Sequence, residues 1–517
     1  MDRVNKNSFG LRRTAILGFQ IILGLALVVT LSGTVFPFSM DSLFYISTAE
    51  HVVRFKGLVF SNFSVFPATA EVLPSVVLHP PGYPLLIALL KWMGMSAYTA
   101  ALVLPRIGFC LLPVLFFLVF RKLMPFVAAL IAAFVCTFVF PVIKCSLMAW
   151  ADVPYLCFAL ISFLTAFWIM ERKGKVSIIL IVCAGALAGY ALLIKYIGMT
   201  LVASILTGFV VWVGLRLVTL RVFVKTVLFY LLGFLMVVGP MVIHNMILFR
   251  TALPYKMPPS YVPLPVNVHD YFREMAQIIF ASPLFEGVVI VMILGLGVLF
   301  MYCARVWSGR DPISFVLGSI LAAYFFFNSI FLIAFKSVCY APEPIDDRYL
   351  IQVAWILLGV CVWGLHRILM KIRSVWPFDM KMAGTLLLLA FVLIQVFPAT
   401  DFFFFEERLK SLAGKVESYA PMLRALPQDV VIVSNVPDLT YYFVRRNVRM
   451  LAGYTPQALA SVLAPAKDYV VFLLKEEEFL ITRDYFRYWR RAPGYIKIYS
   501  DENVDLLMMR ASVGRKP

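Results

Sequence analysis

The chain has 517 residues, of which 62% are hydrophobic and only 14% are charged. Soluble domains average about half apolar and about a quarter charged residues, so too few polar side chains are present to cover a water-soluble protein of this length. The composition excludes a set of soluble domains, a collagen, a coiled coil, a disordered chain and a disulfide-stabilised secreted domain. It predicts a polytopic membrane protein.

The net charge is +18, from 46 basic and 28 acidic residues. In a soluble protein this excess would indicate a polyanionic partner such as nucleic acid. In a membrane protein basic residues gather in the cytoplasmic loops and orient the helices, so we expect the lipid bilayer and no nucleic acid as partner. The eight cysteines contain no C-x-x-C pair, and the sequence therefore has no zinc or redox motif and no disulfide framework.

Long apolar windows define the predicted transmembrane helices, because a helix needs about 20 apolar residues to cross the hydrocarbon core. Such windows predict eleven spans, at residues 14–36, 99–120, 124–143, 154–170, 176–194, 196–215, 223–248, 287–304, 313–335, 349–366 and 383–400. The first window is too long for a signal-peptide core and no small-residue cleavage site follows it, so we expect it to be retained.

Basic residues fall into alternate loops of this array. Four of them precede the first span, namely Arg3, Lys6, Arg12 and Arg13, and this places the N-terminus in the cytoplasm. The loops on the same side contain further Lys and Arg, whereas the short loops opposite contain few. We expect a multi-pass protein of a bacterial inner (cytoplasmic) membrane, although an endoplasmic-reticulum protein would show the same pattern.

Two long segments fall on the outer, extracytoplasmic side. The first outer loop covers residues 37–98 and begins with a predicted interfacial helix. Residues 401–517 are more polar and combine predicted strands with helices, the strands at 430–433, 469–474 and 495–499 and the helices at 438–446 and 476–489. The predicted organisation is a transmembrane module over residues 1–400 and a small extracytoplasmic α/β domain over 401–517, which has no glycine-rich loop for a nucleotide.

Ionisable side chains gather at one level of the predicted helix array. They lie at the outer ends of spans or just beyond, and they are Asp41, His79, Lys144, Asp152, Lys195, Asp346, Asp347 and Arg348. Charged groups at membrane depth are costly and are functional candidates, and a transporter tends to place them near the midplane. The outer position favours a reaction site at the membrane surface over a conduction path.

Four of these candidates also have a purely structural interpretation. Asp41 and Asp152 stand where carboxylates cap helices. Lys195 lies between two apolar spans and could extend its ammonium to the interface. Arg348 could bind a phosphate or pair with a neighbouring aspartate.

His79 stands at the start of a rigid segment, His79-Pro80-Pro81-Gly82-Tyr83-Pro84. Three prolines fix the backbone and Gly82 permits a turn, so the segment holds the imidazole in place. Imidazole can neutralise a phosphate or hydrogen-bond to it. The alternative is an ordinary turn.

These features together resemble the GT-C glycosyltransferases. An aspartate ends the first span, an amphipathic helix follows, a basic residue precedes Pro-Pro, a second acidic residue lies in the second outer loop, and Arg348-Tyr349-Leu350 opens a late span. Over roughly residues 14–400 the chain is similar to the branch with the lipid A aminoarabinose transferase and the protein O-mannosyltransferases. The tail resembles the outer α/β domain of such enzymes.

The resemblance implies a glycosyltransferase that moves a sugar from a polyprenyl-phosphate donor to a glycan, lipid or protein acceptor on the extracytoplasmic face, with inversion. Asp41 would be the general base, and Asp152 would orient the acceptor or share that role. The donor phosphate would be bound by His79, Lys195 and Arg348. Supporting residues would be Tyr45, Tyr83, Asp347 and Tyr349.

Two positions depart from the family pattern. Members often have Asp-Glu at the first motif, where this chain has Asp41-Ser42. A divalent metal, the one cofactor under consideration, would therefore lose an expected ligand. The aminoarabinose branch has a lysine where this chain has His79, so the contact with phosphate would be weaker or dependent on pH.

Two other functions fit parts of the pattern. A transporter or flippase for an amphiphilic anionic lipid would use the outer basic groups as a gate, but the two halves show no inverted repeat and the outer domain has no role in gating. An inactive scaffold with a sensor domain would have lost Asp41 and Asp152, and both are present. The transferase is therefore the prediction.

Overall fold

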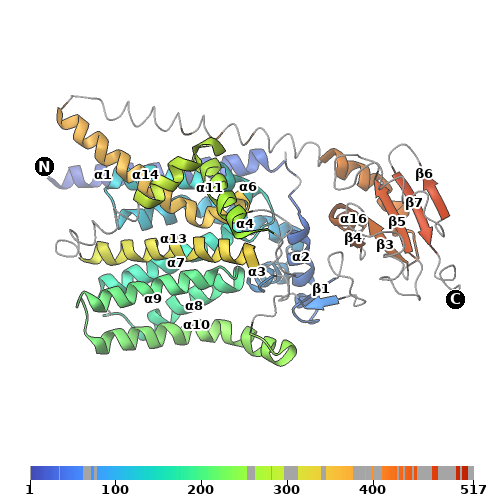
Figure 1. Cartoon of the computed structure of the whole chain (residues 1–517), viewed down its shortest axis with the longest axis horizontal. Coiled ribbons are helices and arrows are strands. Elements are labelled where there is room, and N and C mark those ends of the chain that lie inside the picture. The colour runs from blue at the N-terminus through green and yellow to red at the C-terminus, as the bar shows by residue number, and fades with distance from the viewer. Residues whose placement is uncertain are drawn as a thin grey trace. The chain divides into compact units, whose positions relative to one another are not determined.

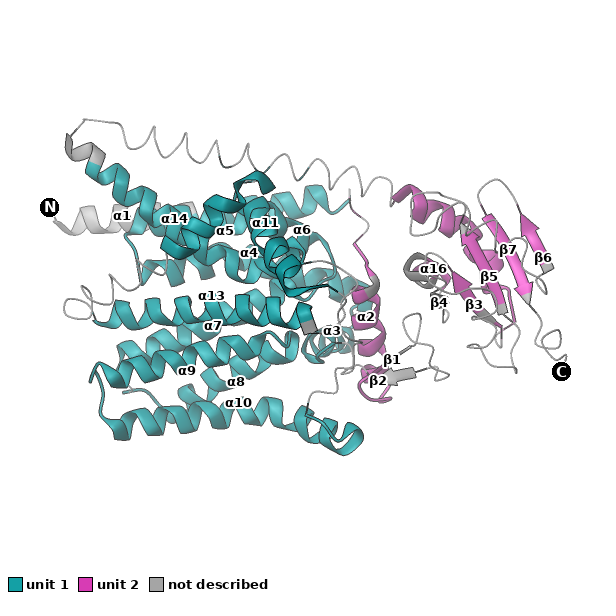
Figure 2. Cartoon of the chain, in the orientation of Figure 1, with its two compact units in different colours: residues 1–33, 76–402 teal, residues 34–75, 403–517 magenta. Residues whose placement is uncertain are grey.

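In the computed structural model the chain divides into two compact units (Figures 1 and 2). The first unit contains residues 1–33 and 76–402, and the second contains residues 34–75 and 403–517. The structure describes residues 2–33, 35, 37–61, 72–74, 79–173, 175–252, 262–280, 282–295, 312–338, 345–375, 391, 395, 399, 410–427, 430–434, 437–444, 448–450, 469–474, 496–500 and 504–509.

The first unit is a bundle of helices. Their bounds are α1 (Asp2–Leu31), α3 (Gly82–Trp92), α4 (Ala97–Arg121), α5 (Phe126–Phe138), α6 (Phe140–Leu147), α7 (Asp152–Glu171), α8 (Ile178–Ile194), α9 (Gly198–Gly214), α10 (Leu220–Phe249), α11 (Leu264–Phe280), α13 (Pro312–Val338) and α14 (Asp347–Val375). The buried side chains between them are overwhelmingly aliphatic and aromatic, whereas many large apolar side chains of α10 face outward. An apolar outer face is what a helix in contact with lipid requires.

Among the described residues, five helices are long and apolar enough to cross a membrane: α4, α7, α10, α13 and α14. Two bent helix pairs raise this number to seven, α5 with α6 at 51° and α11 with Pro283–Gly295 at 114°. Helices α1, α8 and α9 also occupy predicted spans, but their apolar parts have only 10–17 residues. All but three residues of the predicted span 383–400 and half of 287–304 lie outside the described residues, so a count of eleven stays a prediction.

Helix α11 is an element that the apolar windows do not predict. It contains His269, Asp270, Arg273 and Glu274, and these charges lower the hydropathy of any window across it. One face is nevertheless buried, with Tyr271, Met275 and Ile278 separated by three or four residues. The helix is therefore amphipathic and packs on α13 and α14 through that face.

Glycines allow α8 and α10 to pack unusually closely. A Cβ atom at Gly185 would lie 1.8 Å from the carbonyl oxygen of Tyr230, and one at Gly233 would lie 1.9 Å from that of Val182. Small residues at such an interface let two helix backbones approach within the membrane. This contact fixes the position of α8, whose C-terminal end leads into the site.

The second unit contains helix α2 (Met40–Val53), an antiparallel pair of short strands, β1 (Val59–Ser61) and β2 (Val72–Pro74), and a five-stranded sheet. The sheet has the order β4-β3-β5-β7-β6, from β3 (Val431–Ser434), β4 (Val448–Met450), β5 (Tyr469–Leu474), β6 (Ile496–Ser500) and β7 (Val504–Met509). Strand β3 is parallel to β4 and β5, whereas β7 is antiparallel to β5 and β6. Residues 410–424 and α16 (Pro437–Val444) are helical.

The predicted elements of the tail compare directly with this sheet. Strands β3, β5 and β6 occupy the three segments for which strands are predicted, and α16 overlaps the predicted helix 438–446. The predicted helix 476–489 lies outside the described residues. The prediction missed the three-residue strand β4, and it missed β7 because Asp505 interrupts the apolar run.

Candidate functional site

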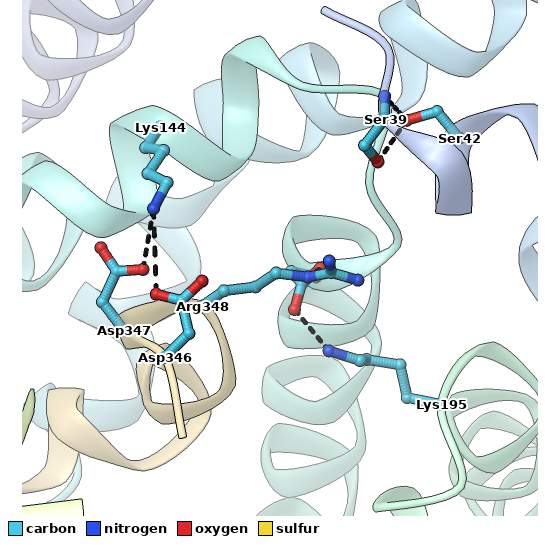
Figure 3. A network of polar contacts seen from close by, with 8 residues as sticks. Ser39, Ser42, Lys144, Lys195, Asp346, Asp347 and Arg348 are labelled. Atoms are coloured by element: carbon cyan, nitrogen blue, oxygen red, sulfur yellow. Dashed lines mark hydrogen bonds and ion pairs between the residues drawn. The ribbon is translucent and has the colours of Figure 1, made fainter. Parts of the chain in front are cut away.

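The charged side chains of the first unit meet where α8 and α13 end and α7 and α14 begin. Asp152, the first residue of α7, is their centre and its side chain is fully buried. Its Oδ1 accepts a hydrogen bond from Lys195 Nζ, just after α8, and its Oδ2 accepts one from Arg348 Nε at 3.2 Å. Figure 3 labels the two cations, Lys195 and Arg348. A buried carboxylate is stable only when cations or donors satisfy both oxygens, and here two cations from distant segments do so.

This geometry tests the structural interpretations that the sequence offered for these residues. The N-cap of α7 is Ala151, and the carboxylate of Asp152 makes no capping bond. Lys195 does not extend to solvent, since its side chain is only 14% exposed and is bonded to Asp152. The structural interpretations of Asp152 as a cap and of Lys195 as an interfacial side chain are therefore wrong, and Arg348 reaches a carboxylate on another helix.

A second ion pair lies beside the first one. Lys144 in the last turn of α6 binds Asp347 Oδ1 at 3.0 Å and lies 3.9 Å from Asp346 Oδ1 (Figure 3). Burial alone would raise the pKa of Asp346, but a hydrogen bond with Asp347 and the charges of Lys144 and Arg348 lower that pKa below its usual range. Asp347, predicted as a supporting residue, thus connects α14 to α6.

Aromatic rings lie against the cations. The guanidinium carbon of Arg348 is 4.4 Å from the ring centroid of Trp150, and Lys336 Nζ is 4.4 Å from that of Tyr349. Such contacts contribute about 0.5–2 kcal/mol, with the larger values at desolvated sites. The sequence analysis did not include Lys336 and Trp150 in the site. Lys336 shares the outer level of the other cations, which is the signal that could have identified it.

The segment that starts at His79 packs against the end of α8. Tyr190 donates a hydrogen bond to the carbonyl oxygen of Gly82 at 2.9 Å. A Cβ atom at Gly82 would lie 2.5 Å from the carbonyl carbon of Leu193, two residues before Lys195. Gly82 is the first residue of α3, so glycine is required here by a close backbone approach and not by a turn, and the predicted reason for it is wrong.

Two residues of this segment have different surroundings. His79 is only partly buried. Tyr83 is fully buried and donates a hydrogen bond to the carbonyl oxygen of Ala101 at 2.6 Å. This bond attaches α3 to α4, so the support that Tyr83 provides is structural.

Asp41 and Tyr45 belong to the second unit, on α2. The cap of α2 is Ser39, whose backbone N–H donates to Ser42 Oγ at 3.1 Å (Figure 3). Asp41 lies in the first turn and is partly exposed, so its interpretation as the helix cap is wrong. Tyr45 is 3% exposed and belongs to the buried face of the helix.

The described residues do not fit a bound metal. Within them, no three His, Cys, Asp or Glu side chains lie together in a group that could hold an ion. Ser42, which stands where the family pattern often has glutamate, has its hydroxyl 3.3 Å from that of Ser39.

Comparison with known proteins shows a shared fold at low sequence identity. No family model matches the sequence, and no curated protein matches it. ArnT from Cupriavidus metallidurans, in the apo state and bound to undecaprenyl phosphate, aligns with TM-scores of 0.54 and 0.55 at 12% identity, over 98% of this chain and 99–100% of ArnT. The oligosaccharyltransferase AglB from Archaeoglobus fulgidus, in complex with an inhibitory peptide and a dolichol-phosphate, aligns with a TM-score of 0.53 at 11% identity, over 89% of this chain and 69% of AglB. Both are GT-C glycosyltransferases, and the chain has their fold.

Proposed function

We propose that the protein is a membrane glycosyltransferase that transfers a sugar from a polyprenyl-phosphate donor to an acceptor, with inversion at the anomeric carbon. The observation that carries the proposal is the buried cluster in which Lys195 and Arg348 converge on Asp152. Its support is the fold, which is shared with a protein whose structure contains undecaprenyl phosphate.

The cations of the cluster suit the departing group of this reaction. When the bond between the anomeric carbon and the phosphate oxygen breaks, the lipid phosphate gains negative charge. Lys195 and Arg348, together with His79, would stabilise that charge by hydrogen bonds from positions fixed before the reaction. Preorganised donors stabilise a negative charge more strongly in a site with little water than the same donors do in bulk water.

Asp152 has a different role in this mechanism from the one that the resemblance implies. Both its oxygens already accept hydrogen bonds from the cations Lys195 and Arg348. We infer that it holds Lys195 and Arg348 in position, as the counter-ion that lets two cations be buried together.

Asp41 remains the proposed general base. It would remove the proton of the acceptor hydroxyl on the face of the sugar opposite the phosphate. Asp41 is a partly exposed residue in the first turn of α2. The hydrogen bonds of Ser39 and Ser42 fix the start of this helix.

The remaining assignments follow from the membrane character of the chain. The polyprenyl tail would lie along the apolar helices, and the glycan, lipid or protein acceptor would be presented on the extracytoplasmic face of a bacterial inner membrane, where the tail domain 401–517 would also lie. The basic N-terminus would remain in the cytoplasm.

The test is sugar transfer by purified protein in detergent, with a panel of polyprenyl-phosphate sugars and release of polyprenyl phosphate as readout. Removal of a general base costs about 10²–10⁴-fold in rate, so Asp41→Asn should lower kcat at least about 100-fold. Glu50→Gln, an equivalent change on the same helix α2, is the matched control and should stay within about twofold.

Two outcomes would contradict the proposal. Full transfer by Asp41→Asn would remove Asp41 as the base. No release from any donor, together with movement of the same lipid across vesicle membranes, would replace the transferase by the lipid flippase.

A further inference from the structure

Tyr349 lies among three cations from three segments of the chain, two of them buried and the third, Lys195, largely buried. Lys336 Nζ is 4.4 Å from its ring centroid, Lys195 Nζ 5.6 Å and the guanidinium carbon of Arg348 5.7 Å. Lys336 is 4% exposed and Arg348 is 8% exposed. All three distances are within the roughly 6 Å over which a cation is attracted to an aromatic ring.

The arrangement brings positive charges together in a largely buried environment. Cations that share one ring repel each other, and this repulsion grows where the dielectric constant is low. The π-electrons of the ring offset part of the repulsion without adding a formal negative charge. Lys195 and Arg348 share the single carboxylate of Asp152, so an anionic ligand beside them would meet two cations that one carboxylate holds.

We propose that Lys336 is a third cation of the donor phosphate site and that Tyr349 is a positioning residue, which holds Lys336 near Lys195 through its ring and not through its hydroxyl. This inference rests on the proposed function. It extends the site from α8 and α14 to the last turn of α13, and it identifies the ligand contacted there as the phosphate of the lipid.

The first experiment measures the binding of undecaprenyl phosphate to the purified protein, together with KM for the lipid-phosphate sugar. Lys336→Met keeps the length of the side chain and removes its charge, and we expect it to weaken binding about tenfold, equivalent to about 1.4 kcal/mol. Lys336→Arg should restore binding to within about threefold. Lys122→Met is the control, because Lys122 pairs with Glu171 at the opposite end of α4 and α7.

The second experiment separates the ring of Tyr349 from its hydroxyl. Tyr349→Phe should bind undecaprenyl phosphate like the wild type, whereas Tyr349→Leu should lose about as much affinity as Lys336→Met. If the ring acts through Lys336, the double variant Lys336→Met/Tyr349→Leu should bind about as well as either single variant, because the two changes remove the same interaction. Melting temperatures in detergent identify any variant that fails to fold, and the comparison of Phe with Leu uses folded protein only.

The outcomes distinguish this inference from the proposed function. If the wild type transfers sugar but Lys336→Met binds undecaprenyl phosphate normally, Lys336 is not a phosphate ligand and the inference fails alone. If Tyr349→Phe loses as much affinity for undecaprenyl phosphate as Tyr349→Leu does, the hydroxyl is the active group and the role of the ring is refuted. If the wild type neither transfers sugar nor binds undecaprenyl phosphate, the proposed function fails, and the inference with it.

Discussion

Replacement of Gly82 by alanine tests how the segment that starts at His79 is connected to Lys195. The Cβ of the alanine would lie 2.5 Å from the carbonyl carbon of Leu193, 2.6 Å from its oxygen and 2.7 Å from the nitrogen of Ile194. These are backbone atoms, so no side-chain rotation can relieve the overlap. Since ordinary contacts begin at 3.4 Å, the start of α3 and the end of α8 would have to separate by about 0.9 Å (3.4 − 2.5).

The displacement has two expected consequences. Overpacking of this kind costs about 1–3 kcal/mol of stability, and the hydrogen bond from Tyr190 to the carbonyl of Gly82 would be strained as well. Lys195 follows directly after Ile194 and is bonded to Asp152, so it would move with the end of α8. A misplacement of about 1 Å can cost about 100-fold in rate, and we expect kcat/KM to fall by about that factor.

The assay combines kcat/KM for sugar transfer with the melting temperature of the purified protein. The control is Gly318→Ala in α13, where a Cβ atom meets no atom within 4 Å and alanine should stabilise the helix by up to about 1 kcal/mol. If Gly82→Ala melts at the same temperature as the wild type, the close approach of the two backbones is refuted. A lower melting temperature with unchanged kcat/KM would show that the packing is correct but that Gly82 does not position Lys195.

Two further variants test the cluster and the bundle. Asp152→Asn removes the charge that Lys195 and Arg348 share and should destabilise the protein by about 3–5 kcal/mol, seen as a lower melting temperature together with lost binding of undecaprenyl phosphate; an unchanged melting temperature would contradict the buried ion pairs. Gly233→Leu would push α10 away from α8 and should abolish monodisperse protein in size-exclusion chromatography. A Cβ atom at Gly239 on the same helix meets no atom within 4 Å, so Gly239→Leu should purify normally. Equal behaviour of the two glycine variants would argue against the α8–α10 contact.

Local composition was sufficient for the membrane character and for most helix positions. An apolar stretch such as that of α4 or α10 can be recognised as a membrane span from its own composition, because the free-energy cost of placing a residue in lipid depends mainly on that residue. Helix α11 was missed for the same reason, since its charges mask a buried face that only periodicity reveals. Two predicted β-strands, β3 and β5, are continuous apolar runs, and β6 alternates apolar residues around Lys497. Strand β7 was not predicted, and Asp505 interrupts its apolar run.

The sequence alone also predicted that the candidate site residues lie at one level, because each charge stands next to the end of an apolar window. The sequence could not predict which of these side chains pair with one another. The carboxylate of Asp152 meets Lys195 from 43 residues away and Arg348 from 196 residues away, and Lys336 in α13 meets Tyr349 in α14. Likewise, only the packing of α3 on α8 explains why position 82 is glycine. Side-chain pairing and backbone clearance depend on how helices distant in sequence pack, and that is set by the tertiary structure as a whole.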